Sequence, residues 1–327
     1  MGSSSYSDDF YRDRAADRAA KGTPTFAHHD AVATGKVAKA AHAKLDPKGV
    51  TRESRDSAEH PNSTAIAVIF DVTGSMGGVP VTLQAKIPQL MGLLLRKGYI
   101  VDPQILFGAV GDFYSDHVPL QVGQFESGIE MDDDITKLYL EGGGGGSYQE
   151  SYQNALYFLA RHTVTDCWEK RSKKGYAFLI GDEMAYESCT KKEVSAIFGD
   201  TVQEDVSLQK IVAEVQERYN LFFVIPSGTS HYSDPKLKAF WQKLIGGENV
   251  IMLDQPDAVC ESVGTAIGLL EGTTDLHDAT ATLTADGTAK GIVATVGDAL
   301  APLASKAALA KVGAASLPES GTGTARL

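Results

Sequence analysis

The chain has 327 residues, of which 43% are hydrophobic and 22% are charged, as in ordinary globular proteins. It lacks an uninterrupted apolar run of the roughly 20 residues that span a bilayer, and its polar N-terminus has no apolar signal core, so we expect neither membrane insertion nor Sec export. The net charge of −12 resides in residues 64–271, because the flanking segments 1–63 (10 Lys/Arg, 9 Asp/Glu) and 272–327 (4 Lys/Arg, 5 Asp/Glu) nearly balance. An acidic middle repels nucleic acid and favours cations or basic partner surfaces.

The cysteines are few and widely spaced. Cys167, Cys189 and Cys260 form no CxxC motif, and their odd number does not suit a disulfide framework. We expect small buried thiols in a reducing, cytoplasmic compartment.

The two ends of the chain differ in composition from the middle. Residues 1–63 are rich in Ala, Asp, Arg, Lys and His, and we expect a polar N-terminal extension with short helices and no core of its own. Residues 272–327 are rich in Ala, Thr and Gly. We expect a C-terminal tail that forms either a weak β-hairpin, turning at Asp286-Gly287, or a flexible segment.

Residues 64–271 alternate between strand and helix patterns. The predicted strands span 64–70, 104–110, 119–125 (an edge strand), 175–180, 221–225 and 249–253. The predicted helices span 81–97 (with a kink at Pro88), 151–161, 191–198, 207–219, 235–245 and 257–270. This alternation predicts an α/β fold with a mainly parallel sheet covered by helices on both faces. Ligands of such sheets bind at the carboxyl ends of the strands.

The loop after the first of these strands carries oxygen-bearing side chains at every second position. Asp71, Thr73 and Ser75 follow the apolar run TAIAVIF, and alternate positions can point to one side as the chain turns. Oxygen ligands suit Mg²⁺, which prefers octahedral coordination and keeps several waters. One carboxylate and two hydroxyls would leave the ion able to accept an external anionic oxygen.

Two later loops add to this pattern. Five glycines, residues 142–146, precede Ser147 and let the backbone approach a ligand closely, but no Gly-Lys-Ser/Thr follows, so the loop is not a P-loop. Asp182 places a second carboxylate at the end of the strand GYAFLI. The combination is more specific than any of its members.

Residues 64–271 resemble the von Willebrand factor A (VWA) domain family. AVIFDVTGSM is similar to its first strand and its metal-ion-dependent adhesion site (MIDAS) motif, and LIGDE to its later strand with the distal aspartate. FGAVGDFYSD, GGGGGSYQESYQNAL and FWQKLIGGENVIMLDQP resemble segments of the intracellular branch. The resemblance implies a Rossmann-like, doubly wound sheet with one antiparallel edge strand, one bound Mg²⁺ or Mn²⁺, and metal-dependent partner binding.

The resemblance also implies roles for particular residues. Asp71, Thr73 and Ser75 would be metal ligands, with Thr73 in place of the commoner serine, and Asp182 would act through water. The family's remaining threonine lies in the Gly-rich loop, where this sequence departs from the pattern. We assign that position to Ser147, with two alternatives that the sequence leaves open, Glu150 and Ser151. Asp112 would orient ligands or waters from behind the site.

Several neighbouring residues have simpler interpretations. We expect Asp116 and Glu183 to be solvated, and the run 132–134 to be a helix N-terminus or a solvated loop rather than a Ca²⁺ site, because it lacks the EF-hand spacing. We expect Tyr157 and Trp241 to pack in or near the core.

Three functions are compatible with these features. The favoured one is a non-catalytic, Mg²⁺-dependent protein-binding module whose open coordination position accepts an Asp or Glu of a partner. The family resemblance suggests a cytoplasmic adaptor, for example of a MoxR-type AAA+ ATPase. The second is a Mg²⁺-dependent phosphoryl-transfer or hydrolytic enzyme with Asp71 as nucleophile, against which the lack of a convincing acid–base pair counts. The third is a structural subunit that assembles through its termini.

Overall fold

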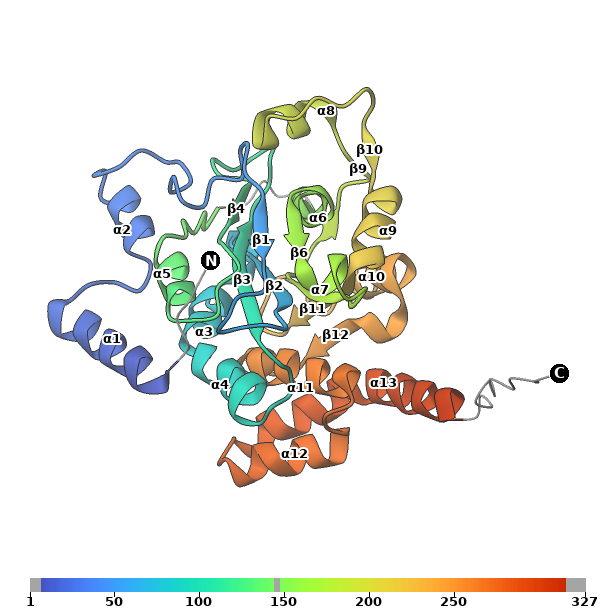
Figure 1. The fold of residues 1–327 in the computed structure, drawn as a ribbon. Coiled ribbons are helices and arrows are strands. Elements are labelled where there is room, and N and C mark those ends of the chain that lie inside the picture. The colour runs from blue at the N-terminus through green and yellow to red at the C-terminus, as the bar shows by residue number, and fades with distance from the viewer. Residues whose placement is uncertain (1–6, 144–147, 316–327) are drawn as a thin grey trace.

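A computed structural model describes residues 7–143 and 148–315 and shows a mixed α/β protein around a six-stranded sheet (Figure 1). The strand order is β12-β11-β7-β2-β3-β4, in which β4 is antiparallel to its neighbour and all other pairs are parallel. The expected mainly parallel sheet with one antiparallel edge strand is therefore confirmed.

The strands of the central sheet occupy positions close to those predicted. They are β2 (Thr64–Asp71), β3 (Pro103–Val110), β4 (Leu120–Val122), β7 (Gly175–Ile180), β11 (Tyr219–Pro226) and β12 (Val250–Leu253). Short strands outside it pair in twos: β1 (Arg52–Ser54) with β6 (Thr163–Thr165), β5 (Gln149–Glu150) with β8 (Met184–Ala185), and β9 (Ser188–Cys189) with β10 (Val206–Ser207).

Thirteen α-helices are found in the described residues. They are α1 (Asp8–Lys21), α2 (Ala27–Ala33), α3 (Val79–Ala85), α4 (Ile87–Met91), α5 (Glu130–Thr136), α6 (Tyr152–Arg161), α7 (Asp166–Glu169), α8 (Lys191–Glu193), α9 (Leu208–Arg218), α10 (Pro235–Ile245), α11 (Val259–Glu271), α12 (Leu276–Ala285) and α13 (Lys290–Ala315). Two π-helical turns, Gly92–Arg96 and Val194–Phe198, continue α4 and α8.

The predicted helix over 81–97 is divided in the structure. It begins earlier, at Val79, breaks at Lys86 between α3 and α4, and then continues as the π-helical turn. The break lies just before Pro88, which has no N–H to donate and disfavours a helical conformation in the residue before it. The predicted kink is therefore a full interruption.

The central strand β2 explains why helices cover both faces of the sheet. All eight of its residues are buried. Its side chains alternate between two hydrophobic clusters, with Ile66, Val68 and Phe70 in one and Ala65, Ala67 and Ile69 in the other. The first cluster lies against α3, α4 and α11, and the second against α6, α9 and α10 (Figure 1).

The order of the strands also predicts where a ligand site would lie. The chain runs from β2 to β3 on one side and later returns to β7 on the other side of β2. In doubly wound sheets a crevice opens at the carboxyl ends of the strands where the order reverses. That position here is the junction of β2 and β7.

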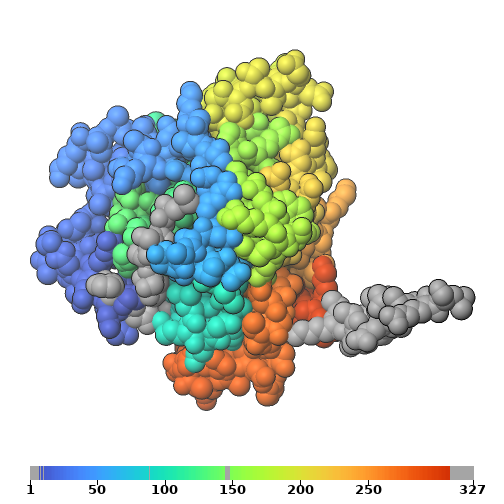
Figure 2. All heavy atoms as spheres, in the orientation of Figure 1, coloured from blue at the N-terminus to red at the C-terminus, as the bar shows by residue number. Residues whose placement is uncertain are grey.

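The N-terminal segment packs more closely than its composition suggested. Tyr11, Phe26 and Leu45 are buried in the first hydrophobic cluster. The N-terminal segment covers one flank of the molecule, coloured blue in Figure 2. Arg18 forms an ion pair with Asp132, which is fully buried at the start of α5. Of the two alternatives expected for residues 132–134, the structure shows the helix N-terminus and not the solvated loop.

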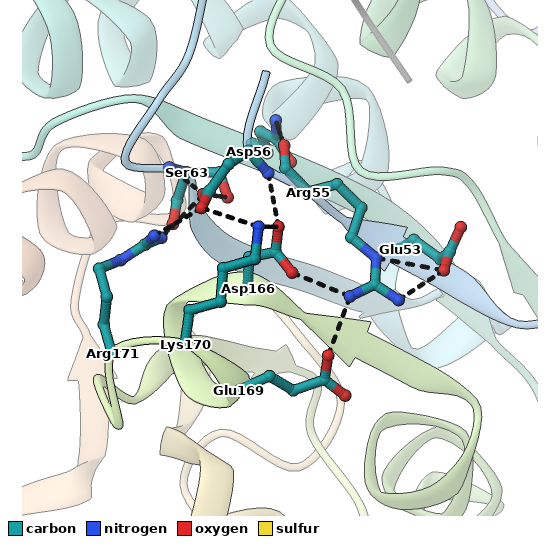
Figure 3. A network of polar contacts seen from close by, with 9 residues as sticks. Glu53, Arg55, Asp56, Ser63, Asp166, Glu169, Lys170 and Arg171 are labelled. Atoms are coloured by element: carbon teal, nitrogen blue, oxygen red, sulfur yellow. Dashed lines mark hydrogen bonds and ion pairs between the residues drawn. The ribbon is translucent and has the colours of Figure 1, made fainter. Parts of the chain in front are cut away.

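A polar network fixes the end of this segment to the domain (Figure 3). Strand β1 pairs in parallel with β6, and Arg55, directly after β1, donates hydrogen bonds to Glu53, Asp166 and Glu169. Asp56 accepts hydrogen bonds from Arg171, from Lys170 and from the Ser63 hydroxyl. Residues 53–63 are thereby attached to the α7 region.

The C-terminal segment is helical, so the expectation of a β-hairpin or a flexible tail is wrong for its described part. Asp286-Gly287 does form a turn, but it joins α12 to α13, and Gly287 has φ +81°, the left-handed region that favours glycine. The Ala- and Leu-rich sequence favours helix once packing is available. Val296, Leu300 and Leu303 supply that packing within the first hydrophobic cluster.

One helical segment in the described residues, Lys290–Leu309, is long and apolar enough to cross a membrane by length and composition alone. The sequence pattern alone did not distinguish this helix. About 28% of its 18-residue window is buried inside the protein.

Candidate functional site

The predicted strand-end residues meet at the junction of β2 and β7. The parallel register pairs Phe70 with Ile180, so the loops that begin at Asp71 and Gly181 leave the sheet at the same edge. Asp71 and Asp182 are both fully buried there, and Thr73 is 4% exposed.

A continuous chain of hydrogen bonds joins four of the predicted ligands. The Thr73 hydroxyl donates to Oδ1 of Asp71 at 2.7 Å and lies 3.0 Å from the Ser75 hydroxyl. The Ser75 hydroxyl in turn donates to Oδ1 of Asp182 at 2.7 Å. The structure therefore brings together Asp71, Thr73, Ser75 and Asp182, of which the first and the last are 111 positions apart in the sequence. Two separate loops supply them.

Two further contacts hold the carboxylates in place. The buried hydroxyl of Tyr152 donates a 2.8 Å hydrogen bond to Oδ2 of Asp71, and the backbone N–H of His231 donates a 3.0 Å hydrogen bond to Oδ2 of Asp182. Gly181 makes room for the tyrosine, because a Cβ at that position would lie 1.8 Å from its hydroxyl oxygen. In the sequence, Tyr152 is one of several aromatic residues that follow the Gly-rich loop. A glycine directly before Asp182 was the available signal of a close neighbour.

The start of the Gly-rich loop lies directly against the first loop. The backbone N–H of Gly142 donates to the Val72 carbonyl at 3.2 Å, and the N–H of Gly74 donates to the Gly143 carbonyl. A Cβ on Gly74 would lie 3.0 Å from the carbonyl oxygens of Gly142 and Gly143, so any larger residue there would push the two loops apart by a few tenths of an ångström. Ser147, our first choice for the remaining ligand, lies outside the described residues, and its assignment stays a prediction.

The two alternatives to Ser147 differ in their surroundings. The Ser151 hydroxyl accepts a hydrogen bond from the Phe113 backbone N–H at 2.9 Å and donates to Oδ1 of Asp112 at 3.2 Å. Glu150 is 2% exposed, and its Oε2 has no hydrogen-bond partner among the described residues. Of these two side chains, Glu150 is the one with an uncommitted ligand atom.

Glu183 joins Glu150 on the same side of the site. Strands β5 and β8 pair Glu150 with Ala185, two residues beyond Glu183. Glu183 is 7% exposed, its Oε2 also has no partner among the described residues, and its Oε1 lies 3.5 Å from Nε2 of His231. Glu183 is therefore buried, and the expectation that it is solvated is wrong.

The electrostatics of the site reflect this concentration of buried carboxylates. Burial is the main cause that raises the pKa of Asp71 to about 7, with a smaller contribution from Asp182. Burial and the charge of Asp71 raise the pKa of Glu183 to about 8 and that of Glu150 to about 11. In the absence of a cation the site therefore holds protons at neutral pH, and a bound cation would compete with them.

Asp112 and Asp116 form a second layer of carboxylates behind Ser151. Asp112 is 3% exposed and accepts hydrogen bonds from the hydroxyls of Ser115 and Ser151. Its own backbone N–H donates to Oδ2 of Asp116 at 2.7 Å. Asp116 is thus engaged with the protein and partly buried, which corrects the expectation that it is solvated. The role of Asp112 in orienting ligands or waters stays a prediction.

Another acidic cluster lies far along the chain, on the surface. The potential ligand atoms of Asp275, His277 and Asp278 lie within 4.8 Å of one another, and all three residues are exposed. Asp275 caps the start of α12 by accepting a hydrogen bond from the backbone N–H of Asp278. Helix capping accounts for this cluster without a metal.

The donors at the β2–β7 junction fit a hard divalent cation. The candidate ligand atoms described there are oxygens of carboxylate and hydroxyl groups. This is the ligand type that Mg²⁺, Mn²⁺ and Ca²⁺ prefer. Oε2 of buried Glu150, which has no hydrogen-bond partner among the described residues, is a further candidate ligand atom. Thr73 and Ser75 would bind the ion directly, and Asp71 and Asp182 would bind it through water.

Comparison with known proteins adds little to this picture. No family model matches the chain. No curated protein matches it either. Among solved structures, the open conformation of the pilus adhesin SpaC from Lactobacillus rhamnosus GG is similar at 10% identity and a TM-score of 0.44, over 68% of this chain and 31% of the adhesin. Proximal thread matrix protein 1 from the mussel byssus is similar at 10% identity and a TM-score of 0.41, over 69% of this chain and 47% of that protein. The chain spans less than half the length of either structure.

Proposed function

We propose that this chain is a divalent-cation-dependent protein-binding module of the VWA type, with a MIDAS at the junction of β2 and β7. The observation that carries the proposal is the hydrogen-bonded chain from Asp71 through Thr73 and Ser75 to Asp182. Two loops that are far apart in the sequence supply these oxygens at one point of the sheet edge. The order of side-chain types also matches the motif on which the sequence resemblance depends.

The contacts around the two aspartates suit a role in which they act through water. Tyr152 and the backbone N–H of His231 each engage one carboxylate oxygen, so Asp71 and Asp182 are held in fixed orientations. The hydroxyls of Thr73 and Ser75 then remain as direct ligands of Mg²⁺ or Mn²⁺. The cation would supply an electrophilic position at which a partner's Asp or Glu carboxylate completes the coordination.

Exposed aromatic side chains close to the site support a protein partner. Tyr148 is 59% exposed and its ring lies 4.8 Å from that of His231, which contacts both Asp182 and Glu183. Tyr114, in the loop after Asp112, is 55% exposed. Tyrosine is enriched in protein interfaces, where it offers a large apolar surface and one polar group. A partner that reaches the cation would contact these rings.

The cellular role follows from the sequence resemblance. We propose an assembly or adaptor function in the cytoplasm, with a MoxR-type AAA+ ATPase as one candidate partner. In this proposal the module binds and does not catalyse. The overall net charge of −12 suits a partner whose acidic ligand group is surrounded by basic residues.

Metal binding by the purified chain tests the proposal first. We expect isothermal titration calorimetry with Mn²⁺ to show saturable binding, and the double variant Thr73→Ala/Ser75→Ala to weaken it at least tenfold. The exposed variant Asp278→Asn serves as the matched control, since it removes an acidic residue from the surface cluster at α12. Equal binding by the double variant and the wild type would refute the site.

Partner capture tests the second half of the proposal. The wild-type chain, immobilised with Mg²⁺, should retain a specific protein that EDTA releases and that the Thr73→Ala/Ser75→Ala variant fails to capture. The same protein should bind the Asp278→Asn control. Retention that survives both EDTA and the double substitution would favour a structural subunit that assembles through other surfaces.

A further inference from the structure

A cavity of about 670 Å³ lies between α1, α4, α11, the end of α12 and the start of α13. Helix α11 contacts both α4 and α12 below the sheet in Figure 1. Leu93, Leu283 and Ile292 form an apolar part of the wall, and most of the other lining residues are polar. None of the four MIDAS residues lines this cavity. Its volume lies within the range of cavities that hold small-molecule ligands.

Basic side chains outnumber acidic ones in the lining of this cavity. The charged lining residues are Arg12, Lys86, Arg96 and Lys97 on one side of the balance, and Glu261 and Asp286 on the other. Each of the two lysines forms a 2.8 Å ion pair with one of the carboxylates. Arg12 lies 3.6 Å from Asp9, but both side chains are largely exposed, so that pair is weak. The lining as a whole is therefore basic and favours an anionic ligand.

The start of α13 brings backbone donors to the same cavity. Gly287, Thr288 and Ala289 line it, and the Ala289 carbonyl accepts the first hydrogen bond of the helix, from the N–H of Val293 at 3.1 Å. Ala289 therefore occupies the N-cap position, and its side chain has no acceptor with which to cap the helix. The N–H groups of the first turn have no partner within the helix and carry partial positive charge. Phosphate groups bind to such donors.

A buried carboxylate beside this cavity sets a second requirement for the ligand. Glu261 is 1% exposed, and Lys86 occupies its Oε1, whereas its Oε2 has no hydrogen-bond partner among the described residues. A buried oxygen in this state is destabilising and rare in native proteins. Because Glu261 lines the cavity, a ligand bound there can supply the missing donor from a hydroxyl group.

We propose that this cavity binds a small phosphate monoester that also carries hydroxyl groups, which is the chemistry of sugar phosphates and nucleotides. The phosphate group lies at the start of α13, among the basic side chains of the lining. A hydroxyl group of the same ligand donates to Oε2 of Glu261. The inference goes beyond the proposed function and does not depend on it, because the cavity and the MIDAS share no residue.

Isothermal titration calorimetry of the full chain in EDTA tests the proposal, because a MIDAS without its cation offers phosphate no alternative site. We expect ribose 5-phosphate to bind at one site, and adenosine, which has hydroxyl groups but no phosphate, not to bind. Inorganic phosphate, which lacks the sugar, should bind at least tenfold more weakly than ribose 5-phosphate. AMP identifies the source: binding tighter than that of ribose 5-phosphate would support a nucleotide site, and weaker binding a sugar-phosphate site. Failure of both esters to bind would overturn the proposal.

A substitution at the N-cap of α13 tests the position of the phosphate. Ala289→Asp places a carboxylate where it accepts hydrogen bonds from the first turn and competes with the phosphate. This variant should bind ribose 5-phosphate at least tenfold more weakly and should unfold at a higher denaturant concentration, so misfolding cannot explain the lost binding. Ala294→Asp adds the same charge at an exposed position further along α13 and is the matched control. Equal weakening by the two variants would overturn the site at the helix start.

Glu261→Gln tests the contact with the ligand's hydroxyl group. Glutamine keeps the shape of the side chain but removes its negative charge. Binding of ribose 5-phosphate should weaken, whereas binding of inorganic phosphate should stay the same or become tighter, because a nearby negative charge is lost. A parallel loss of affinity for both probes would overturn the hydroxyl contact. Far-ultraviolet circular dichroism checks that each variant is folded.

Discussion

The hydroxyl of Tyr152 donates a 2.8 Å hydrogen bond to Oδ2 of Asp71, and this contact connects the first residue of α6 to the last residue of β2. Tyr152 is completely buried and its ring also packs against Phe223 and Trp241. The tyrosine thus links the proposed metal site to the hydrophobic cluster on one face of the sheet. Its position depends on Gly181, which leaves space for the hydroxyl group.

This contact predicts the effect of Tyr152→Phe. The substitution removes only the hydroxyl, so the ring packing remains, and Asp71 loses a donor that fixes the orientation of its carboxylate. We expect the free energy of unfolding to fall by about 1–2 kcal/mol, in line with the loss of a buried hydrogen bond, and Mn²⁺ affinity to fall several-fold. Chemical denaturation and calorimetry measure the two effects. Tyr232→Phe, which removes a hydroxyl bonded to Asp254 outside the site, is the control and should leave Mn²⁺ affinity unchanged.

The extent to which the sequence predicted this site depends on the kind of residue. Asp71, Thr73, Ser75 and Asp182 follow apolar strands directly, and parallel strands bring their carboxyl ends to one edge, so these positions could be predicted from local pattern and general topology. The sequence left Glu150 open as an alternative ligand, but it did not show that Tyr152 bonds to Asp71 or that Glu183 is buried. Their proximity to the site depends on the course of the Gly-rich loop and on the β5–β8 pairing, which involves only two residues in each strand.

The same distinction applies to the fold. The strands of the central sheet were predicted within a few residues because continuous apolar runs mark strands that are buried on both faces. The flanking segments were not, because their sequences contain few large apolar residues. Tyr11, Phe26 and Leu45, spread over the N-terminal segment, are buried individually rather than in a periodic pattern. In α13, alanines separate the buried residues, and short-range pattern does not show which side packs.

The raised pKa values at the site predict a pH dependence for the metal-free chain. The pKa of Asp71 is raised to about 7 and that of Glu183 to about 8, above the values of about 4 expected for the unfolded chain, so the folded state binds more protons between these limits. The stability that comes from these protonated groups is fully present near pH 4 and is lost as the pH rises through 7 and 8. We expect the free energy of unfolding in EDTA to decrease over this interval.

Cation binding should reverse this trend. Saturating Mg²⁺ replaces the protons and binds only the folded state, so stability at pH 8 should rise by an amount that grows with ion concentration. Denaturation curves at pH 5 and pH 8, each with Mg²⁺ and with EDTA, provide the measurement. In EDTA, Asp71→Asn should lose less of its free energy of unfolding between pH 5 and pH 8 than the wild type does. A metal-free chain that becomes more stable between pH 5 and pH 8 would contradict the assignment of these groups.

The network around Arg55 predicts a different kind of stability change. Asp166 is 2% exposed, and Arg55 donates a 2.9 Å hydrogen bond to it (Figure 3). Arg55→Gln leaves this buried carboxylate with fewer partners and loosens the attachment of β1 to the domain. We expect a loss of about 1–3 kcal/mol in the free energy of unfolding, because a buried charge loses a charged donor. Glu169→Gln alters a half-exposed partner of the same arginine and should cost less than about 1 kcal/mol. Equal effects of the two variants would show that burial of Asp166 is not the deciding factor.

The C-terminal helix gives a prediction that separates a packed helix from a flexible tail. Leu300 is completely buried within the first hydrophobic cluster, whereas Leu309, nine residues later in the same helix α13, is 73% exposed. Leu300→Ala creates a cavity under the helix and should lower the free energy of unfolding by about 2–5 kcal/mol. Leu309→Ala removes the same atoms from an exposed position and should change stability by less than about 0.5 kcal/mol. Chemical denaturation compares both variants with the wild type. An unchanged m-value would show that the same unit unfolds in each case. A tail that did not pack on the domain would give two small and equal effects, so the difference between these leucines measures how far α13 belongs to the folded core.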